Sequence, residues 1–344
     1  MSVEGHHRDE PSLAGPLFSV RRAARAEAAR SDRSAADVEH LLLGLLVDGG
    51  PSTRALVRAG ADLPRLRAAV ADLDRPAPAV AVPPALQPHV AYYDQLDGGP
   101  PLSGRAWQLL DRIPDGLGDD RQLLRALLDD PRATHLLEHA GVDHAELRRT
   151  ASDHDPSRPT DAGAPATSDD GDDSGDDVPP PWGGRWTEAR YSQVVPVDPA
   201  PTWALLSSPQ RRPEWDPRSG RVEVDPERPE RFSTFEQQGR GPTPVAVTRQ
   251  VPEREIWWER GNRGAEPSGR SWTAQARLEP EGAGSVLHLR TRWPWLGGVL
   301  TPLRLLQVVV VRAGLRGMAQ RITQAAGSAT PPQPPDSRGD RPAS

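Results

Sequence analysis

The chain of 344 residues contains no cysteine, and this absence excludes several kinds of chemistry. A thiolate nucleophile, a disulfide framework and a cysteine-ligated zinc site all need the sulfur atom. Lysine is missing too, so all 42 basic side chains are arginine. A Walker A phosphate loop, a Schiff base and a protein-kinase active site each need an ammonium group at a fixed place. We therefore do not expect an ATPase, and we attribute the missing lysine to genomic base composition.

Long apolar runs are also missing. The N-terminal stretch MSVEGHHRDEPSLAGPLFSV is polar and has no apolar segment of signal-peptide length. The most apolar stretch, LTPLRLLQVVVVRAGL, is too short to span a bilayer and is interrupted by Arg304, Gln307 and Arg312. We expect a cytoplasmic protein without a membrane span.

Composition divides the chain into two differently built parts. Nine of the ten tryptophans lie at or after Trp182, and only Trp107 precedes it. Between the parts, DHDPSRPTDAGAPATSDDGDDSGDDVPPP has almost no apolar side chain, which is typical of a disordered segment. We predict a helical repeat domain at 14–150, a disordered Asp/Pro-rich linker at 151–183, an α+β domain at 184–328 and a disordered tail at 329–344.

A leucine-rich helix occurs twice in the first part. In DVEHLLLGLL, the apolar residues Val38, Leu41, Leu42 and Leu45 have the spacing of a stripe that a helix buries on one face. The later stretch RQLLRALL repeats this stripe with Leu123, Leu124, Leu127 and Leu128, whereas Leu43 is replaced by Arg125. The two copies predict two repeats of one helical unit that pack together.

The ends of the following helices are repeated as well. Gly60 and Gly141 suit a left-handed helix end, and Asp62 and Asp143 suit the N-cap of the next helix. A Pro-rich insertion at about 74–101 separates the two copies.

The pattern ARAEAARSDRSAADVEHLLLGLL, followed by LVRAGADLPRLRAAV and a weaker second copy, resembles the Clp N-terminal domain. That resemblance implies an all-α two-repeat bundle that docks a protein partner, such as a Clp-system component or substrate, and performs no chemistry. The docking candidates are Glu39, His40 and Arg121. Val38 stands where the family commonly has Thr, so Asp37 or Ser34 is left to cap the helix. Because Arg121 replaces the second acidic residue of the family, we do not carry over phosphoarginine binding.

The stretch HLLEH matches the H-x-x-E-H pattern of a zinc peptidase, in which two histidines one turn apart bind the metal. However, His135 and His139 correspond to Arg54 and Arg58 of the first repeat, on a face that we expect to be exposed. No third ligand is obvious, even counting His144. We expect no metal and no other cofactor.

The second part has the composition of strands. After ARYSQVVPVD, a helix is predicted in PAPTWALLSSP, because Asp198 can cap it and Pro199 suits its first turn. Six further stretches have strand composition and are separated by Gly, Pro and acidic turns: GRVEVDPE, RFSTFEQQGR, PVAVTRQVPE, EIWWERGN, GRSWTAQARLEP and SVLHLRTRWPW. A long helix is predicted at about 298–326.

This order of elements, with VVPVDPAPTWALLSSPQRRPEWDPRSGRVEV at its start, resembles the START-like or SRPBCC helix-grip fold. The resemblance implies a mostly apolar cavity between an antiparallel sheet and the long helix. In SVLHLRTRW, we expect Leu287, Leu289, Thr291 and Trp293 to face that cavity, because this set is the more apolar one. The predicted lining residues are Trp215, Phe232, Phe235, Trp257, Trp272, Leu287, Leu289, Trp293, Arg249 and Arg290.

We expect a non-catalytic adaptor or sensor that binds a protein partner and a small hydrophobic ligand. A rival interpretation is a polyketide cyclase or dehydratase, for which Glu236, Glu259 and His288 would be the acid or base and Arg249 or Arg290 would polarise a carbonyl. A third is a protein interaction module whose second cavity is filled by its own tryptophans. No nucleic-acid partner is expected, because the arginines are scattered among acidic residues.

Overall fold

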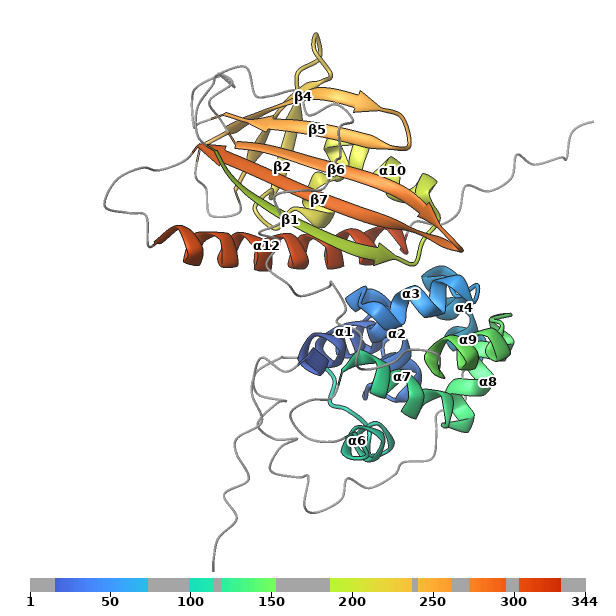
Figure 1. The fold of residues 1–344 in the computed structure, drawn as a ribbon. Helices are drawn as coiled ribbons and strands as arrows, with labels where there is room; N and C mark the ends of the chain where they lie inside the picture. The colour runs from blue at the N-terminus through green and yellow to red at the C-terminus, as the bar shows by residue number, and fades with distance from the viewer. Residues whose placement is uncertain are drawn as a thin grey trace, which may run out of the picture.

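The computed structural model describes residues 16–73, 99–113, 119–152, 186–236, 241–261, 272–294 and 303–328. An all-helical part is followed by a seven-stranded antiparallel sheet with a long C-terminal helix, the helix-grip arrangement (Figure 1). The predicted tail and nearly all of the predicted linker lie outside the described residues. Their predicted disorder therefore stays a prediction.

The helical part is built around one buried helix. Its helices are α1 (Pro16–Arg30), α2 (Val38–Asp48), α3 (Pro51–Arg58), α4 (Leu63–Asp72), α6 (Gly104–Asp111), α7 (Asp120–Leu128), α8 (Pro131–His139) and α9 (His144–Ser152). All eleven residues of α2 are buried, because α1, α3, α4, α6, α7 and α8 all contact this helix. At Gly44, a Cβ would lie 2.5 Å from the carbonyl oxygen of Val20. Glycine therefore lets α1 cross α2 closely.

The two copies have the same backbone turns. Gly60 follows α3 with φ +91°, and Gly141 follows α8 with φ +71°, so the predicted left-handed helix ends are confirmed. The carboxylates of Asp62 and Asp143 each accept a hydrogen bond from the backbone N–H three residues later, at 2.8 and 2.9 Å. The connections α3–α4 and α8–α9 thus have the same left-handed turn and the same kind of N-cap. Asp37, and not Ser34, caps α2.

The second part is a single curved sheet with helices on one side. Its elements are β1 (Trp186–Val195), α10 (Pro199–Ser207), η2 (Pro209–Arg211), α11 (Arg212–Trp215), β2 (Arg221–Val224), β3 (Arg231–Phe235), β4 (Thr243–Val251), β5 (Glu255–Arg260), β6 (Trp272–Glu281), β7 (Gly284–Pro294) and α12 (Leu303–Ala326). The strand order is β1-β7-β6-β5-β4-β3-β2, so the first strand pairs with the last. The predicted strands are confirmed, and so is the closing helix from Leu303 to Ala326; its predicted beginning at 298–302 lies outside the described residues.

The register of the sheet sorts its side chains into two faces, because directly paired residues point to the same side. Trp258 pairs with Ala274, Ala274 with Thr291, and Thr291 with Ala189. Residues of this face form one buried core with Leu315, Ala319 and Ile322 of α12. We call it the inner face. The opposite, outer face carries mostly charged and polar side chains.

The two parts contact each other, although the sequence predicted only two domains joined by a disordered linker. Val57 of α3 forms a buried cluster with Val194 and Val286 of the sheet. The backbone N–H of Leu63 donates to the carbonyl oxygen of Pro196 at 2.7 Å. In Figure 1, α12 lies between the sheet and the helical part. The sequence gives no sign of this interface, because it is made by residues far apart in the chain.

Candidate functional site

A buried arginine lies among three aromatic rings on the inner side of the sheet. Arg212 is the first residue of α11 and is 7% exposed. Its Cζ lies 5.0 Å from the ring centroid of Trp215, 5.5 Å from that of Phe232 and 5.4 Å from that of Trp258. Phe232 and Trp258 belong to the inner face by register. We call Arg212, Trp215, Phe232 and Trp258 the aromatic cage.

Asp216 is the ionic partner of the cage arginine. Its carboxylate accepts hydrogen bonds from Arg212 Nε at 3.1 Å, from Ser219 Oγ at 3.0 Å and from the backbone N–H of Arg218 at 3.1 Å. Burial alone would raise the pKa of Asp216, but the Arg212 charge and these hydrogen bonds outweigh burial and hold that pKa below its ordinary value. Asp216 is therefore ionised, and the protein itself supplies its donors.

Three polar atoms in this interior lack a partner. Arg212 Nη1, Trp215 Nε1 and Trp293 Nε1 are buried and have no hydrogen-bond partner among the described residues. Leaving a buried donor unsatisfied costs about 1–3 kcal/mol, so native proteins usually supply an acceptor, a water or a ligand. All three atoms are donors, so a group that satisfied them would be an acceptor.

A second cation lies beside the cage. Arg260 of β5 is on the inner face between Val245 and Trp272 and approaches Glu236 at 3.5 Å. Burial lowers the pKa of Arg260, although the charge of Asp216 opposes that shift. Arginine stays protonated in proteins all the same.

A pair of stacked indoles continues the inner face. The rings of Trp272 and Trp293 lie 5.2 Å apart with an angle of 15° between their planes. Trp293 is buried, whereas Trp272 is 37% exposed. The stack thus leads from the interior of the sheet to the surface.

The predicted lining residues are divided between the two faces. Six lie on the inner side of the sheet, and all of these except Trp272 are buried: Trp215, Phe232, Trp272, Leu287, Leu289 and Trp293. The other four lie on the outer face: Phe235, Trp257, Arg249 and Arg290. Adjacent residues of a strand point to opposite faces, so Trp257 and Trp258 cannot both point inward. A register shift between Val247 and Arg249 moves the latter to the outer face, where it pairs with Trp257. On that face, Arg290 forms an ion pair with Glu188 at 2.8 Å.

The residues considered as a catalytic acid or base do not come together. Glu259 lies on the outer face, opposite Thr273. His288 is also on the outer face, where its Nδ1 lies 2.8 Å from Ser192 Oγ. Glu236 is the one of the three that lies near the cage, through its ion pair with Arg260.

The sequence analysis did not select Arg212, Asp216 or Arg260. The first two have the i,i+4 spacing of a helical ion pair, in the stretch RPEWD. That spacing could have indicated their pairing. Nothing local could have placed Arg260 near them, since only the sheet register does so.

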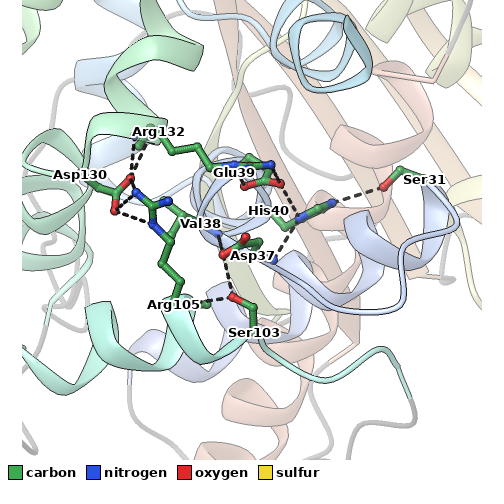
Figure 2. A network of polar contacts seen from close by, with 11 residues as sticks. Ser31, Asp37, Val38, Glu39, His40, Ser103, Arg105, Asp130 and Arg132 are labelled. Atoms are coloured by element: carbon green, nitrogen blue, oxygen red, sulfur yellow. Dashed lines mark hydrogen bonds and ion pairs between the residues drawn. The ribbon is translucent and has the colours of Figure 1, made fainter. Parts of the chain in front are cut away.

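In the helical part, the docking candidates Glu39 and His40 are already engaged in internal contacts. Both carboxylate oxygens of Glu39 accept hydrogen bonds from Arg132, each at 2.8 Å. His40 Nδ1 accepts from the backbone N–H of Asp37 at 3.1 Å, and its Nε2 lies 3.3 Å from Ser31 Oγ. Figure 2 shows this network, in which Arg132 of α8 reaches Glu39 of α2. Docking through Glu39 would require Arg132 to move away.

His40 and Arg121 differ in their surroundings, because His40 is buried next to two carboxylates and Arg121 is not buried. Burial lowers the pKa of His40, and the charges of Glu39 and Asp37 offset that effect only in part. Arg121 is partly exposed at the start of α7.

The two histidines of HLLEH lie together on α8, with ring centroids 6.5 Å apart. His139 Nε2 is 3.6 Å from a carboxylate oxygen of Asp72. Within the described ranges, no group of three or more His, Asp or Glu side chains is arranged to hold a metal. The corresponding arginines of α3, Arg54 and Arg58, both bind Glu281 of the sheet, so this face of the first repeat serves the interface.

No helix of the described residues is long and apolar enough to cross a membrane.

No curated protein matches the chain. Among solved structures, XoxI of Bacillus cereus matches with 10% identity and a TM-score of 0.33, over 40% of this chain and 94% of that protein. Ara h 8.0201 matches with 13% identity and a TM-score of 0.33, over 42% of this chain and 100% of that protein. The di-domain ARO/CYC StfQ of the steffimycin biosynthetic pathway matches with 16% identity and a TM-score of 0.34, over 41% of this chain and 51% of StfQ. Residues 187–324 match the family described as polyketide cyclase / dehydrase and lipid transport, so the sheet and α12 form a domain of the SRPBCC type, whereas the helical part is left unassigned.

Proposed function

We propose that the chain is a non-catalytic adaptor or sensor, in which the SRPBCC domain binds a small, mostly apolar ligand and the helical part docks a protein partner. The observation that carries the ligand proposal is a set of three buried donors, which have no acceptor in the described part of the chain: Arg212 Nη1, Trp215 Nε1 and Trp293 Nε1. A ligand site is typically apolar with a few polar groups that orient the ligand. The cage has this composition.

The family description supports the same proposal, because it combines polyketide cyclases with lipid transport. Both activities need a site for a hydrophobic molecule. If the interior were simply filled by the protein's own tryptophans, Trp215 and Trp293 would be buried with no acceptor for their Nε1 donors. We therefore favour a ligand over a filled core.

Docking of a protein partner rests on the repeated helical unit and its resemblance to the Clp N-terminal domain. The turns after α3 and α8 support a duplicated unit. Because α3 and α4 face the sheet domain, a partner would bind on the remaining surface, which includes α7, α8 and Arg121. A Clp-system component or substrate is the class of partner that the resemblance favours.

A cyclase or dehydratase activity has one observation in its favour, the position of Glu236 and Arg260 next to the cage. A carboxylate and a guanidinium could move a proton and polarise a carbonyl. Incubating the full chain with aromatic polyketide substrates and following absorbance would detect this activity. Turnover that is lost in Glu236→Gln would replace the adaptor proposal with the enzyme.

Ligand binding is tested with the purified full chain by native mass spectrometry, followed by extraction and identification of small molecules. We expect an additional mass that disappears on denaturation. Two adjacent substitutions give a matched comparison. Trp258→Leu changes the cage and should reduce ligand retention, whereas Trp257→Leu changes the outer face and should not. Equal retention by both variants, or a bare protein in every preparation, contradicts the proposal.

Partner docking is tested by calorimetry of the full chain with purified adaptor proteins that bind Clp N-terminal domains. We expect binding that weakens in Arg121→Glu, which reverses a charge on the surface left open by the sheet domain. Binding that is unaffected by Arg121→Glu would place the partner elsewhere. No binding to any such adaptor would leave the helical part without its proposed role.

A further inference from the structure

We propose that the ligand of the SRPBCC domain carries an anionic oxygen, as a carboxylate or a phenolate, on a flat apolar skeleton, and that Arg212 binds this oxygen with Arg260 as a second cation. This inference rests on the proposed ligand-binding function and names the class of ligand. The cage residues and their contacts carry it.

One guanidinium nitrogen of Arg212, Nη1, can still donate a hydrogen bond. Its Nε is used by Asp216, while Nη1 has no partner among the described residues although the side chain is more than nine-tenths buried. The Asp216 carboxylate already accepts from Arg212, Ser219 and the backbone of Arg218. It therefore cannot easily turn to a second guanidinium nitrogen, and a further acceptor must come from outside these residues.

The charges of the interior favour an anion. Arg212 and Arg260 both approach Asp216 closely enough for its charge to affect their ionisation. Glu236 lies 3.5 Å from Arg260 and offsets its charge. The side chain of Arg260 is 29% exposed, so Arg212 Nη1 is the buried charged donor that lacks an acceptor among the described residues. An ionised oxygen would make a stronger hydrogen bond with this charged donor than a neutral oxygen would.

The shape of the cage favours a flat molecule. Three rings surround the guanidinium at 5.0–5.5 Å, and the indole of Trp215 tilts by 44° against that of Trp258, with 5.6 Å between their centroids. Aromatic groups bind against such walls by offset stacking. Trp215 Nε1, which is also unpartnered among the described residues, is a second donor for an oxygen of the ligand.

The test compares two probes of the same size that differ in charge, 2-naphthoate and 2-naphthamide. Calorimetry with the full chain at pH 7 measures both dissociation constants. An ionised acceptor makes a stronger hydrogen bond with a guanidinium than a neutral one does. We therefore expect 2-naphthoate to bind at least about tenfold tighter.

Three variants assign that preference to the cage. Arg212→Met keeps the length of the side chain without its charge, and should bring both probes to similar affinity. Arg212→Lys keeps the charge and should retain part of the preference. Arg249→Met removes an arginine from the outer face and should leave the preference unchanged. If Arg212→Met fails to fold because Asp216 is left without its partner, the double variant Arg212→Met/Asp216→Asn serves in its place.

The outcomes separate this inference from the proposed function. Preference for the anion in the wild type, lost with Arg212 and kept without Arg249, supports the inference. Equal binding of the two probes, or a preference that survives Arg212→Met, overturns it while apolar ligand binding stands. If neither probe binds at millimolar concentration, both the inference and the proposed apolar site are contradicted.

Discussion

The carboxylate of Asp48 accepts a hydrogen bond from the guanidinium of Arg316 at 2.8 Å, although the two residues are 268 positions apart. The same oxygen accepts a second hydrogen bond from Gln320 of α12 at 3.0 Å. Beside this pair, Gln193 Nε2 donates to the carbonyl oxygen of Val47 at 3.1 Å. The end of the most buried helix of the first part is therefore joined to both the sheet and the long helix of the second.

The contact at the end of α2 predicts an unequal effect of two glycine substitutions. A Cβ at Gly49 would lie 2.1 Å from Gln193 Cγ, whereas a Cβ at Gly60 would meet no atom of the described residues within 4 Å. Both glycines have positive φ, so Gly60→Ala should cost about 1–2 kcal/mol for its backbone conformation alone. Gly49→Ala should cost more in urea unfolding and should also raise the radius of gyration in solution scattering. Equal costs with no change in size would contradict a tightly packed interface.

The ion pair between Glu39 of α2 and Arg132 of α8 predicts a coupling energy. Arg132→Met should destabilise the protein by about 1–3 kcal/mol, because it leaves the buried Glu39 carboxylate without its guanidinium. Glu39→Gln removes that charge, so the double variant should lose less stability than the two single variants together. Urea unfolding of all four proteins measures this. Additive losses would mean that the two side chains do not support each other.

His40 should make the helical part sensitive to mild acid. Its pKa is lowered by burial in the folded state, whereas in the unfolded chain it binds a proton below about pH 6.5. The unfolded state then holds more protons, so stability falls as the pH drops from that value toward the lowered pKa. His40→Gln retains an acceptor for the N–H of Asp37, as in a capping box, and should show a flatter profile. His40→Ala loses the acceptor and should be less stable at every pH. An acid sensitivity that persists in His40→Gln would assign it to another group.

Asp120 should make the stability fall as the pH rises, which is opposite to the effect of His40. Its pKa is raised by burial and by the charges of Asp119 and Asp48, and the hydrogen bond from the backbone N–H of Ser52 reduces that effect. The folded state therefore holds its proton more tightly than the unfolded chain, so stability falls as the pH rises from about 3.9 through the raised pKa. Asp120→Asn keeps an acceptor for Ser52 and removes the charge.

Asp120→Asn should thus increase stability at pH 7 by about 1.4 kcal/mol for each unit by which the pKa is raised, and by little at pH 4. Thermal unfolding at the two pH values measures the difference. Asp143→Asn, which keeps an acceptor at the N-cap of α9 and does not contribute to the pKa shift of Asp120, is the control. A variant that is less stable than the wild type at pH 7 would show that the hydrogen bond from Ser52 requires the charge.

Local features of the fold could be predicted from the sequence, because they depend on neighbouring residues. Gly60, Gly141, Asp62 and Asp143 mark their turns by conformational preference alone. The inner face of β7 could be predicted, because Leu287 and the other apolar residues alternate with charged residues within this one strand.

Features that depend on pairing could not be predicted in the same way. In β5, Trp257 and Trp258 are both large and apolar, so alternation does not choose between them. The register shift beside Arg249 reverses the expected side, and no residue type there signals it. The cage needs α11, β3 and β5 to meet, and the interface at Asp48 needs both halves of the chain.

The interface also places the two ends of the described chain near each other. Arg30 of α1 donates to Ser328, just after α12, at 2.8 Å, and Arg316 donates to Ser19 at 2.8 Å. A protease cut between residues 152 and 186 would therefore yield two fragments that remain associated without a covalent link. Expressed as separate polypeptides, they should reassemble into one complex, much as the pieces of a split reporter do.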